Sequence, residues 1–188
     1  MKKLLCIALV LALLLCGCGP KTEDLHPEWD KDWYRADNYL AAEAPTGFTL
    51  IGSRSLISDN SVYYGTWQAG EKHARGKNEV NYDAQLYFIL RVGTDEANAE
   101  ATVQEWIDKE VAAYVTGPLA EQTVGGQDWQ ILPLEENGKP DNPYSHGATA
   151  FAVRGRLSLC AELLLTDGYA GDAGQILNEF LSSLHYGD

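Results

Sequence analysis

Two periods of apolar residues divide the chain into strand-like and helix-like stretches. Alternation with a period of two is clearest in AQLYFILRV (84–92), where both faces are largely apolar, as in a central strand. VYYGTWQ (62–68) is rich in the aromatic and β-branched residues that strands favour. The run 147–165 has Gly155 between two strand-like halves and predicts a hairpin. Alanines at every second position of its first half would let a helix pack close to the sheet.

Helical spacing first appears in 95–115. The residues expected along its apolar stripe are Val103, Trp106, Ile107, Val111 and Tyr114. Acidic residues gather at the start of this stretch, where the helix dipole favours them, and either Thr94 or Asp95 is suited to be the N-cap. Gly117-Pro118 predicts the end of the helix.

A second helix is predicted over 172–184, with Asp172 or Asp167 as its cap. Between the helices, 121–132 contains Gly125-Gly126, a pair able to take positive φ in a hairpin turn. The polar stretch 69–81 predicts a solvated loop between strands. Strands, helix, strands and helix in this order predict an α+β fold, in which an antiparallel β-sheet is flanked by helices.

The N-terminus has the features of a secretory signal peptide. Lys2 and Lys3 precede LLCIALVLALLLC (4–16), an apolar run of 13 residues, which is shorter than the roughly 20 that a membrane span needs. The run ends in Leu15-Cys16-Gly17-Cys18, which resembles the bacterial lipobox L-x-G-C. Cys18 is therefore the expected lipid anchor, because lipidation at Cys16 would put Leu15 where a glycine or alanine is usual.

The resulting plan has three parts. Residues 1–17 are the lipoprotein signal peptide, 18–37 the lipidated cysteine with a polar tether, and 38–188 a single domain. Trp29 and Trp33 are four residues apart, so on a short helix they would share a face that either covers an apolar patch or meets a partner or a lipid headgroup.

The composition of the chain limits the classes of partner that it is expected to bind. The chain has 27 acidic and 14 basic residues, a formal net charge of −13, and no basic run, which argues against nucleic-acid binding. Lipid on Cys18 is therefore the expected contact with the membrane. Cys160 would be the one cysteine left beside it in the mature chain, and its apolar run LSLCAELLL favours a packing role over catalysis.

Three short segments together resemble the signatures of a known family. They are Ala44-Pro45-Thr46-Gly47-Phe48, Val124-Gly125-Gly126 and 176–184. In this order they resemble the P-x-G-(W/F) segment, the V-G-G segment and the closing helix of PsbP-like (PsbP/Mog) domains. The resemblance covers about residues 38–188, and is strongest to small bacterial lipoproteins of this kind. It implies an antiparallel sheet flanked by helices and a role in binding proteins or assisting complexes. It implies no catalytic residue.

The loop 135–147 is the most interesting candidate for chemistry, ahead of the basic cluster around His73 in 69–81, which could meet an anion but is expected to be solvated. Asp141, Tyr144 and His146 bring a carboxylate, a phenol and an imidazole to one long loop, which suits a binding site or a weak metal site, or else a loop with no ligand. The chain contains no zinc-protease, nucleophile-elbow, P-loop or dinucleotide motif, so no cofactor or metal is expected.

These features predict a lipid-anchored binding or accessory module on the extracytoplasmic face of a bacterial membrane. It would act through contacts with a protein partner in the envelope rather than as an enzyme. The alternative is a surface hydrolase, or a small-ligand or metal-binding lipoprotein, that uses the 135–147 loop.

Overall fold

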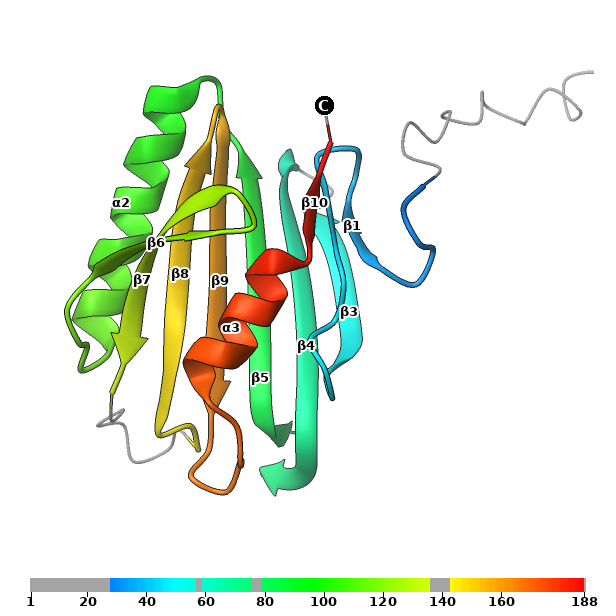
Figure 1. Ribbon diagram of the computed structural model, residues 1–188, viewed down its shortest axis with the longest axis vertical. Coiled ribbons are helices and arrows are strands. Elements are labelled where there is room, and N and C mark those ends of the chain that lie inside the picture. Colours follow the sequence, from blue (N-terminus) through cyan, green and yellow to red (C-terminus); the bar gives the residue numbers. More distant parts are fainter. Residues whose placement is uncertain (1–27, 57–58, 76–78, 136–142, 188) are drawn as a thin grey trace, which may run out of the picture.

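The computed structural model describes residues 28–56, 59–75, 79–135 and 143–187. Most of its strands belong to one large antiparallel sheet (Figure 1). The strands of this sheet, in spatial order, are β3 (Thr49–Leu56), β4 (Asp59–Arg75), β5 (Glu79–Val92), β9 (Leu157–Leu165), β8 (His146–Arg154), β7 (Gln127–Leu134) and β6 (Ala120–Val124). The smaller sheet contains β1 (Tyr34–Ala36), β2 (Leu40–Ala42) and β10 (Leu184–Tyr186) in that order.

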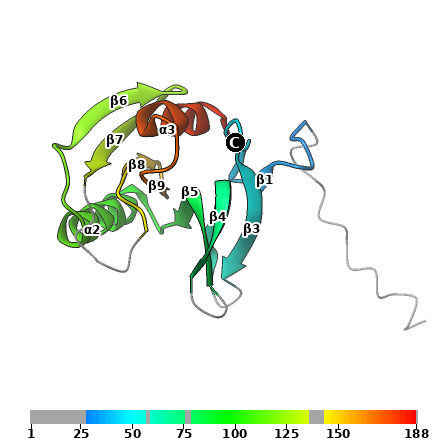
Figure 2. The same cartoon turned by 90° about the horizontal axis from the view of Figure 1, so that it is seen from below.

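Two helices lie on opposite faces of the large sheet, as Figure 2 shows. They are α2 (Glu96–Ala113) and α3 (Ala173–Ser182). Asp95 caps α2 by accepting a hydrogen bond from the backbone N–H of Asn98 at 2.8 Å, and Asp172 caps α3 through the N–H of Gln175 at 2.7 Å. Both predicted helices are confirmed, and the structure selects one of the two caps proposed for each.

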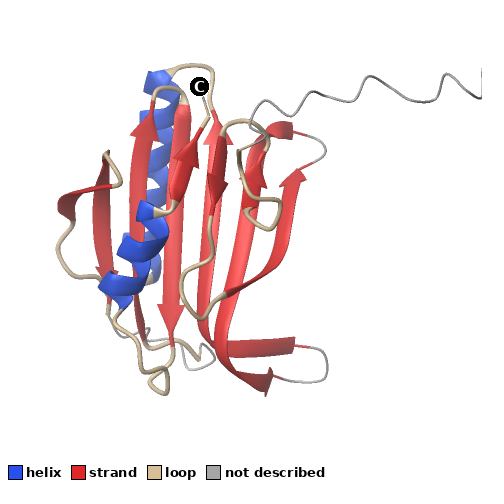
Figure 3. Ribbon diagram, turned by 45° about the vertical axis from the view of Figure 1, so that its right-hand side comes forward, coloured by secondary structure: helices blue, strands red, loops and turns tan. Residues whose placement is uncertain are grey.

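The predicted α+β fold class is wrong, because the described chain is mostly β (Figure 3). Much of the difference lies in 69–81, which was expected to be a loop but belongs largely to β4 and β5, strands of 17 and 14 residues. Backbone pairing within this long hairpin sustains strands whose side chains are polar and carry no apolar alternation. The strands β1, β2 and β10 have three residues each, too few to show a period.

The α3 face of the large sheet carries the main core. The predicted alanine row of β8 is buried there, and α3 packs over it with Leu177 and Leu181. The alanines of this row are Ala148, Ala150 and Ala152. Phe180 of α3 is fully buried between Trp67 and Phe88, whose ring centroids lie 5.0 and 5.6 Å from its own. The β1–β2–β10 sheet extends this core beside α3.

The opposite face is covered by α2, which packs on β8 and β9. Val103 and Ile107 are buried there as expected, but Val111 is 51% exposed, so the predicted stripe is wrong at that position. Glu110, one residue earlier, is partly buried instead. The helix therefore turns a carboxylate toward the sheet and an apolar side chain toward water.

Both tryptophans of the predicted tether contact the domain. Trp29 is 5% exposed, and the guanidinium of Arg35 lies 5.7 Å from its ring centroid and donates to its backbone carbonyl oxygen. Trp33 stacks on His185 of β10 at a centroid distance of 4.4 Å. Within the predicted tether, residues 34–36 therefore pair with β2 as the strand β1, and Trp33 contacts β10.

Candidate functional site

The structure separates the residues expected to form a site in the 135–147 loop. Asp141 lies outside the described residues. Tyr144 is 7% exposed and packs in the core beneath α2, where its hydroxyl donates to Oε1 of Gln85 at 2.6 Å. His146 begins β8, and its partner is the neighbouring Ser145. Tyr144 is therefore a buried structural residue in this arrangement.

Ser145, His146 and Asp167 form a cluster that sequence reasoning missed. The Ser145 hydroxyl donates to Oδ1 of Asp167 at 2.5 Å, and Nδ1 of His146 lies 3.0 Å from the same hydroxyl oxygen. A serine nucleophile needs a histidine between it and the carboxylate, so that the histidine takes the serine proton. Here the serine lies in the middle, and its proton points to Asp167. This geometry ties β8 to the turn after β9 and does not activate a nucleophile.

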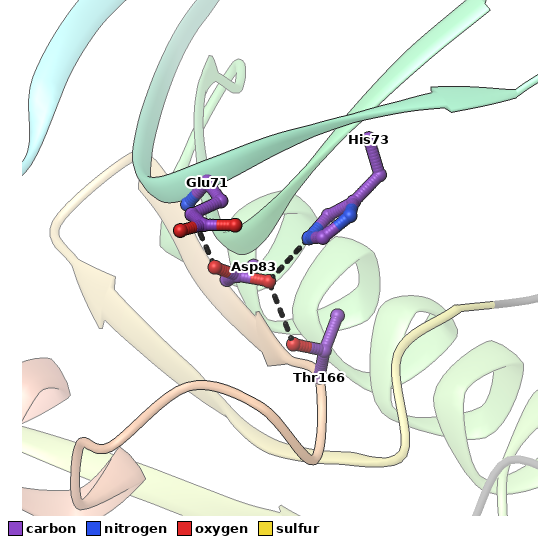
Figure 4. Close-up of polar contacts among 4 residues, drawn as sticks. All are labelled: Glu71, His73, Asp83 and Thr166. Carbon is purple, nitrogen blue, oxygen red and sulfur yellow. Dashed lines mark hydrogen bonds and ion pairs between the residues drawn. The ribbon is translucent and has the colours of Figure 1, made fainter.

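Asp83 is the centre of a second polar cluster at the same end of the sheet (Figure 4). Its carboxylate accepts from the backbone N–H of Glu71 at 2.7 Å and lies 2.6 Å from Nε2 of His73. The hydroxyl of Thr166, after β9, donates to the same carboxylate at 3.3 Å. Gly70, at φ 83°, allows the bulge in β4 that presents the Glu71 N–H. The cluster therefore clamps β4, β5 and the end of β9 together.

We expect Asp83→Asn to destabilise the protein at neutral pH, and to do so less in acid. The Glu71 N–H, then His73, lower the pKa of Asp83 below its ordinary value of 3.8. A carboxyl with a lowered pKa in the folded state contributes stability above its unfolded pKa, and the contribution is lost as the pH falls through the folded value. Urea unfolding of both proteins at pH 7 and at about pH 3 measures this. A difference that persists unchanged in acid would contradict it.

A groove of about 430 Å³ lies on the α2 side of the sheet, over β3, β4 and β5. The residues that line it include Tyr64, Thr66, Tyr87, Ile89 and Glu162. No described helix packs on β3 or β4 here, since α2 lies over β8 and β9 (Figure 2). On the other face of the sheet, Trp67 of β4 and Phe88 of β5 are 0% exposed. The groove is therefore an open part of strands whose opposite face is packed in the core.

Glu162 provides a carboxylate in this groove. It projects from β9, directly opposite Tyr87 of β5 and Thr149 of β8. Its Oε1 accepts a hydrogen bond from the Tyr114 hydroxyl at 3.2 Å. Burial raises the pKa of Glu162, and the hydrogen bond offsets part of that increase. Burial and then the charge of Glu162 raise the pKa of Tyr87, so the carboxylate acts on the tyrosine beside it.

Glu110 brings a second carboxylate to the same region. Burial is the largest cause that raises the pKa of Tyr114, followed by the charges of Glu162 and Glu110. Burial and the same two charges raise the pKa of Cys160, which is buried and free, in agreement with the packing role predicted for it. The region is thus a negative, tyrosine-rich site partly withdrawn from water.

We expect Glu162→Gln to stabilise the folded protein at neutral pH. Because the folded state raises the pKa of Glu162 above its ordinary value of 4.5, it holds the proton more tightly than the unfolded chain does. The free energy of unfolding therefore falls as the pH rises through these two pKa values. Glutamine removes the buried charge and can still accept from Tyr114. In urea unfolding, the variant should be more stable at pH 8 and equal to the wild type at about pH 4. Equal or lower stability at pH 8 would contradict this.

A larger groove, of about 580 Å³, lies between α2 and the β6–β7 hairpin. Its carboxylates include Glu96, Glu100, Glu121 and Asp128, all of them exposed. Exposed acidic side chains are ordinary in a chain of this charge and are stable in water without a ligand. The smaller groove is the better candidate because its carboxylate is partly buried.

In the comparison with known proteins, no protein-family model and no curated protein matches the chain. The resemblance to PsbP-like domains therefore stays a prediction, except for the α+β class, which the strand content contradicts. In the described part of the chain, no three His, Cys, Asp or Glu side chains gather as metal ligands. A search of the same residues finds no helix with the length and apolarity of a membrane span.

Proposed function

We propose that the protein is a lipid-anchored binding or accessory module on the extracytoplasmic face of a bacterial membrane, and that the groove around Glu162 is its binding surface. The observation that carries the proposal is Glu162 itself, a partly buried carboxylate among tyrosines in a groove over β3, β4 and β5, and no described helix packs on β3 or β4. A buried charge destabilises the folded state, and proteins keep such destabilising groups mainly where function needs them. The lipobox-like Leu15-Cys16-Gly17-Cys18 supports the address.

The address is tested by the intact mass of protein extracted from membranes. We expect a chain that begins at Cys18 and carries the mass of two or three acyl chains, because one chain alone gives only marginal anchoring. Cys18→Ala should lose the acyl mass and leave the membrane fraction, whereas Cys16→Ala, the matched control, should keep both. A mature protein without lipid, or loss of lipid in Cys16→Ala alone, would contradict the proposed anchor.

The binding surface is tested by photocrosslinking in intact cells. A photoreactive phenylalanine replaces Tyr64, which lines the groove, or, as the control, Tyr169, which packs against the core on the α3 side. Both changes exchange one aromatic side chain for another. We expect a discrete protein adduct from position 64 and none of the same mass from position 169. The same adducts from both positions, or adducts from position 169 only, would contradict the groove as the binding surface.

A further inference from the structure

Resting on the function proposed above, we infer that the groove around Glu162 recognises a cationic side chain, the ammonium of a lysine or the guanidinium of an arginine, on a basic segment of a partner protein. The carboxylate supplies the opposite charge. Tyr64, two residues before Thr66 along β4, and Tyr87, paired with Thr66 in β5, supply aromatic surfaces. Carboxylate and aromatic rings together are the groups that bind organic cations in proteins.

The carboxylate lacks a basic partner within the described chain. Tyr114 is the one described side chain that donates to Glu162, and no basic side chain contributes to its pKa. A partly buried carboxylate gains most from a cation that arrives with hydrogen-bond donors. The negative charge of Glu110 adds to the attraction, and so does the formal net charge of −13 of the whole chain.

The shape of the groove favours a protein segment over a free amine. Binding sites for small molecules bury most of the ligand surface, whereas this groove is open along the sheet as far as β3, the last strand. Ile51, at a bulge in β3, precedes the groove-lining Gly52 in the chain and is 52% exposed. An apolar side chain next to a cation site suits a segment that presents a lysine together with an apolar neighbour.

The test uses the full lipidated chain in detergent micelles and three probes. They are the capped pentapeptide Gly-Leu-Lys-Leu-Gly, the same peptide with acetyl-lysine, and butylammonium. We expect the lysine peptide to bind at least tenfold more tightly than either of the others. Glu162→Gln should weaken the lysine peptide at least tenfold, and Tyr87→Leu, which keeps an apolar side chain without the ring, should weaken it several-fold. Glu100→Gln removes an exposed charge of α2 and should change the affinity less than twofold.

Each other outcome has a definite meaning. If both peptides bound equally and Glu162→Gln had no effect, recognition of a cationic side chain would be wrong. The groove would still stand as a binding surface. If butylammonium bound as tightly as the lysine peptide, the inferred ligand would be a free amine rather than a protein segment. If no probe binds while position 64 still crosslinks a protein, the cationic ligand is wrong and the proposed function stands. If the crosslink also fails, both are wrong. Unfolding curves of each variant, recorded alongside, separate lost binding from lost folding.

Discussion

Phe180→Ala is expected to remove about 3–5 kcal/mol from the free energy of unfolding. The side chain is fully buried and lies edge-to-face with Trp67 and Phe88, at interplanar angles of 65° and 66°. It links α3 to β4 and β5, so the truncation would leave a cavity where the helix meets the large sheet. The cost is a large share of the 5–15 kcal/mol that stabilises a typical domain.

Urea unfolding of the two proteins at neutral pH measures this effect, and thermal unfolding should show a decrease in Tm on the order of 10 °C. Val115→Ala is the matched control, because Val115 is 57% exposed and its truncation should cost less than about 1 kcal/mol. A Phe180→Ala variant as stable as this control would show that α3 does not pack on the sheet as described.

Gly147→Ala is expected to cost about 3 kcal/mol, by forcing two central strands apart. A Cβ at this position of β8 would lie 2.0 Å from the carbonyl oxygen of Leu163 and 3.3 Å from Cα of Leu164, both in β9. These are backbone atoms of a paired strand, so no side-chain rotation relieves the contact. Amide hydrogen exchange across β8 and β9, together with urea unfolding, should report the loss.

Gly52→Ala is the control for this prediction. No heavy atom lies within 4 Å of a Cβ built at Gly52, and its backbone needs no positive φ. Alanine there reduces the freedom of the unfolded chain, so the change should be neutral or stabilise by up to about 1 kcal/mol. If both glycine variants lost the same stability, the close approach of β8 to β9 would be disproved.

Both helices and their caps follow from local sequence. Asp95 and Asp172 cap helices whose apolar residues recur at helical spacing, and both features depend on residues that are near each other in the chain. The hairpin turns at Gly125-Gly126 and Gly155 also follow, because the glycines take positive φ there.

The strand content does not follow from the sequence, because it depends on pairing between distant or polar segments. β2 has only three residues and pairs with β1 on one side and β10 on the other. β10 is far from β2 in the sequence, near the C-terminal end of the domain. Likewise, β4 and β5 extend through a polar stretch that has the composition of a loop. The spacing of apolar residues predicts a strand poorly when pairing with the neighbouring strand is what stabilises it.

One residue of the candidate site can be recognised in the sequence, but its neighbours cannot. Glu162 is the one charged residue in the apolar run LSLCAELLL, and an acid within a buried strand is a sign of function that the sequence displays. Its neighbours Tyr64, Tyr87 and Tyr114 come from β4, β5 and the end of α2, and only the fold brings them together. Tyr144 looked equally suitable for chemistry in the sequence but is buried as a core residue.

Methyl NMR of the isoleucines tests the groove most directly. In the full chain, with isoleucine δ1 methyl groups labelled, the lysine pentapeptide is titrated in detergent micelles. Ile89 lines the groove and the exposed Ile51 precedes the groove-lining Gly52, whereas Ile131 and Ile176 pack against the core on the α3 face. We expect saturable shifts at Ile89 and Ile51, none at Ile131 and Ile176, and no shifts in Glu162→Gln. Shifts confined to Ile131 and Ile176, or shifts that persist in Glu162→Gln, would contradict a cation-binding groove around Glu162.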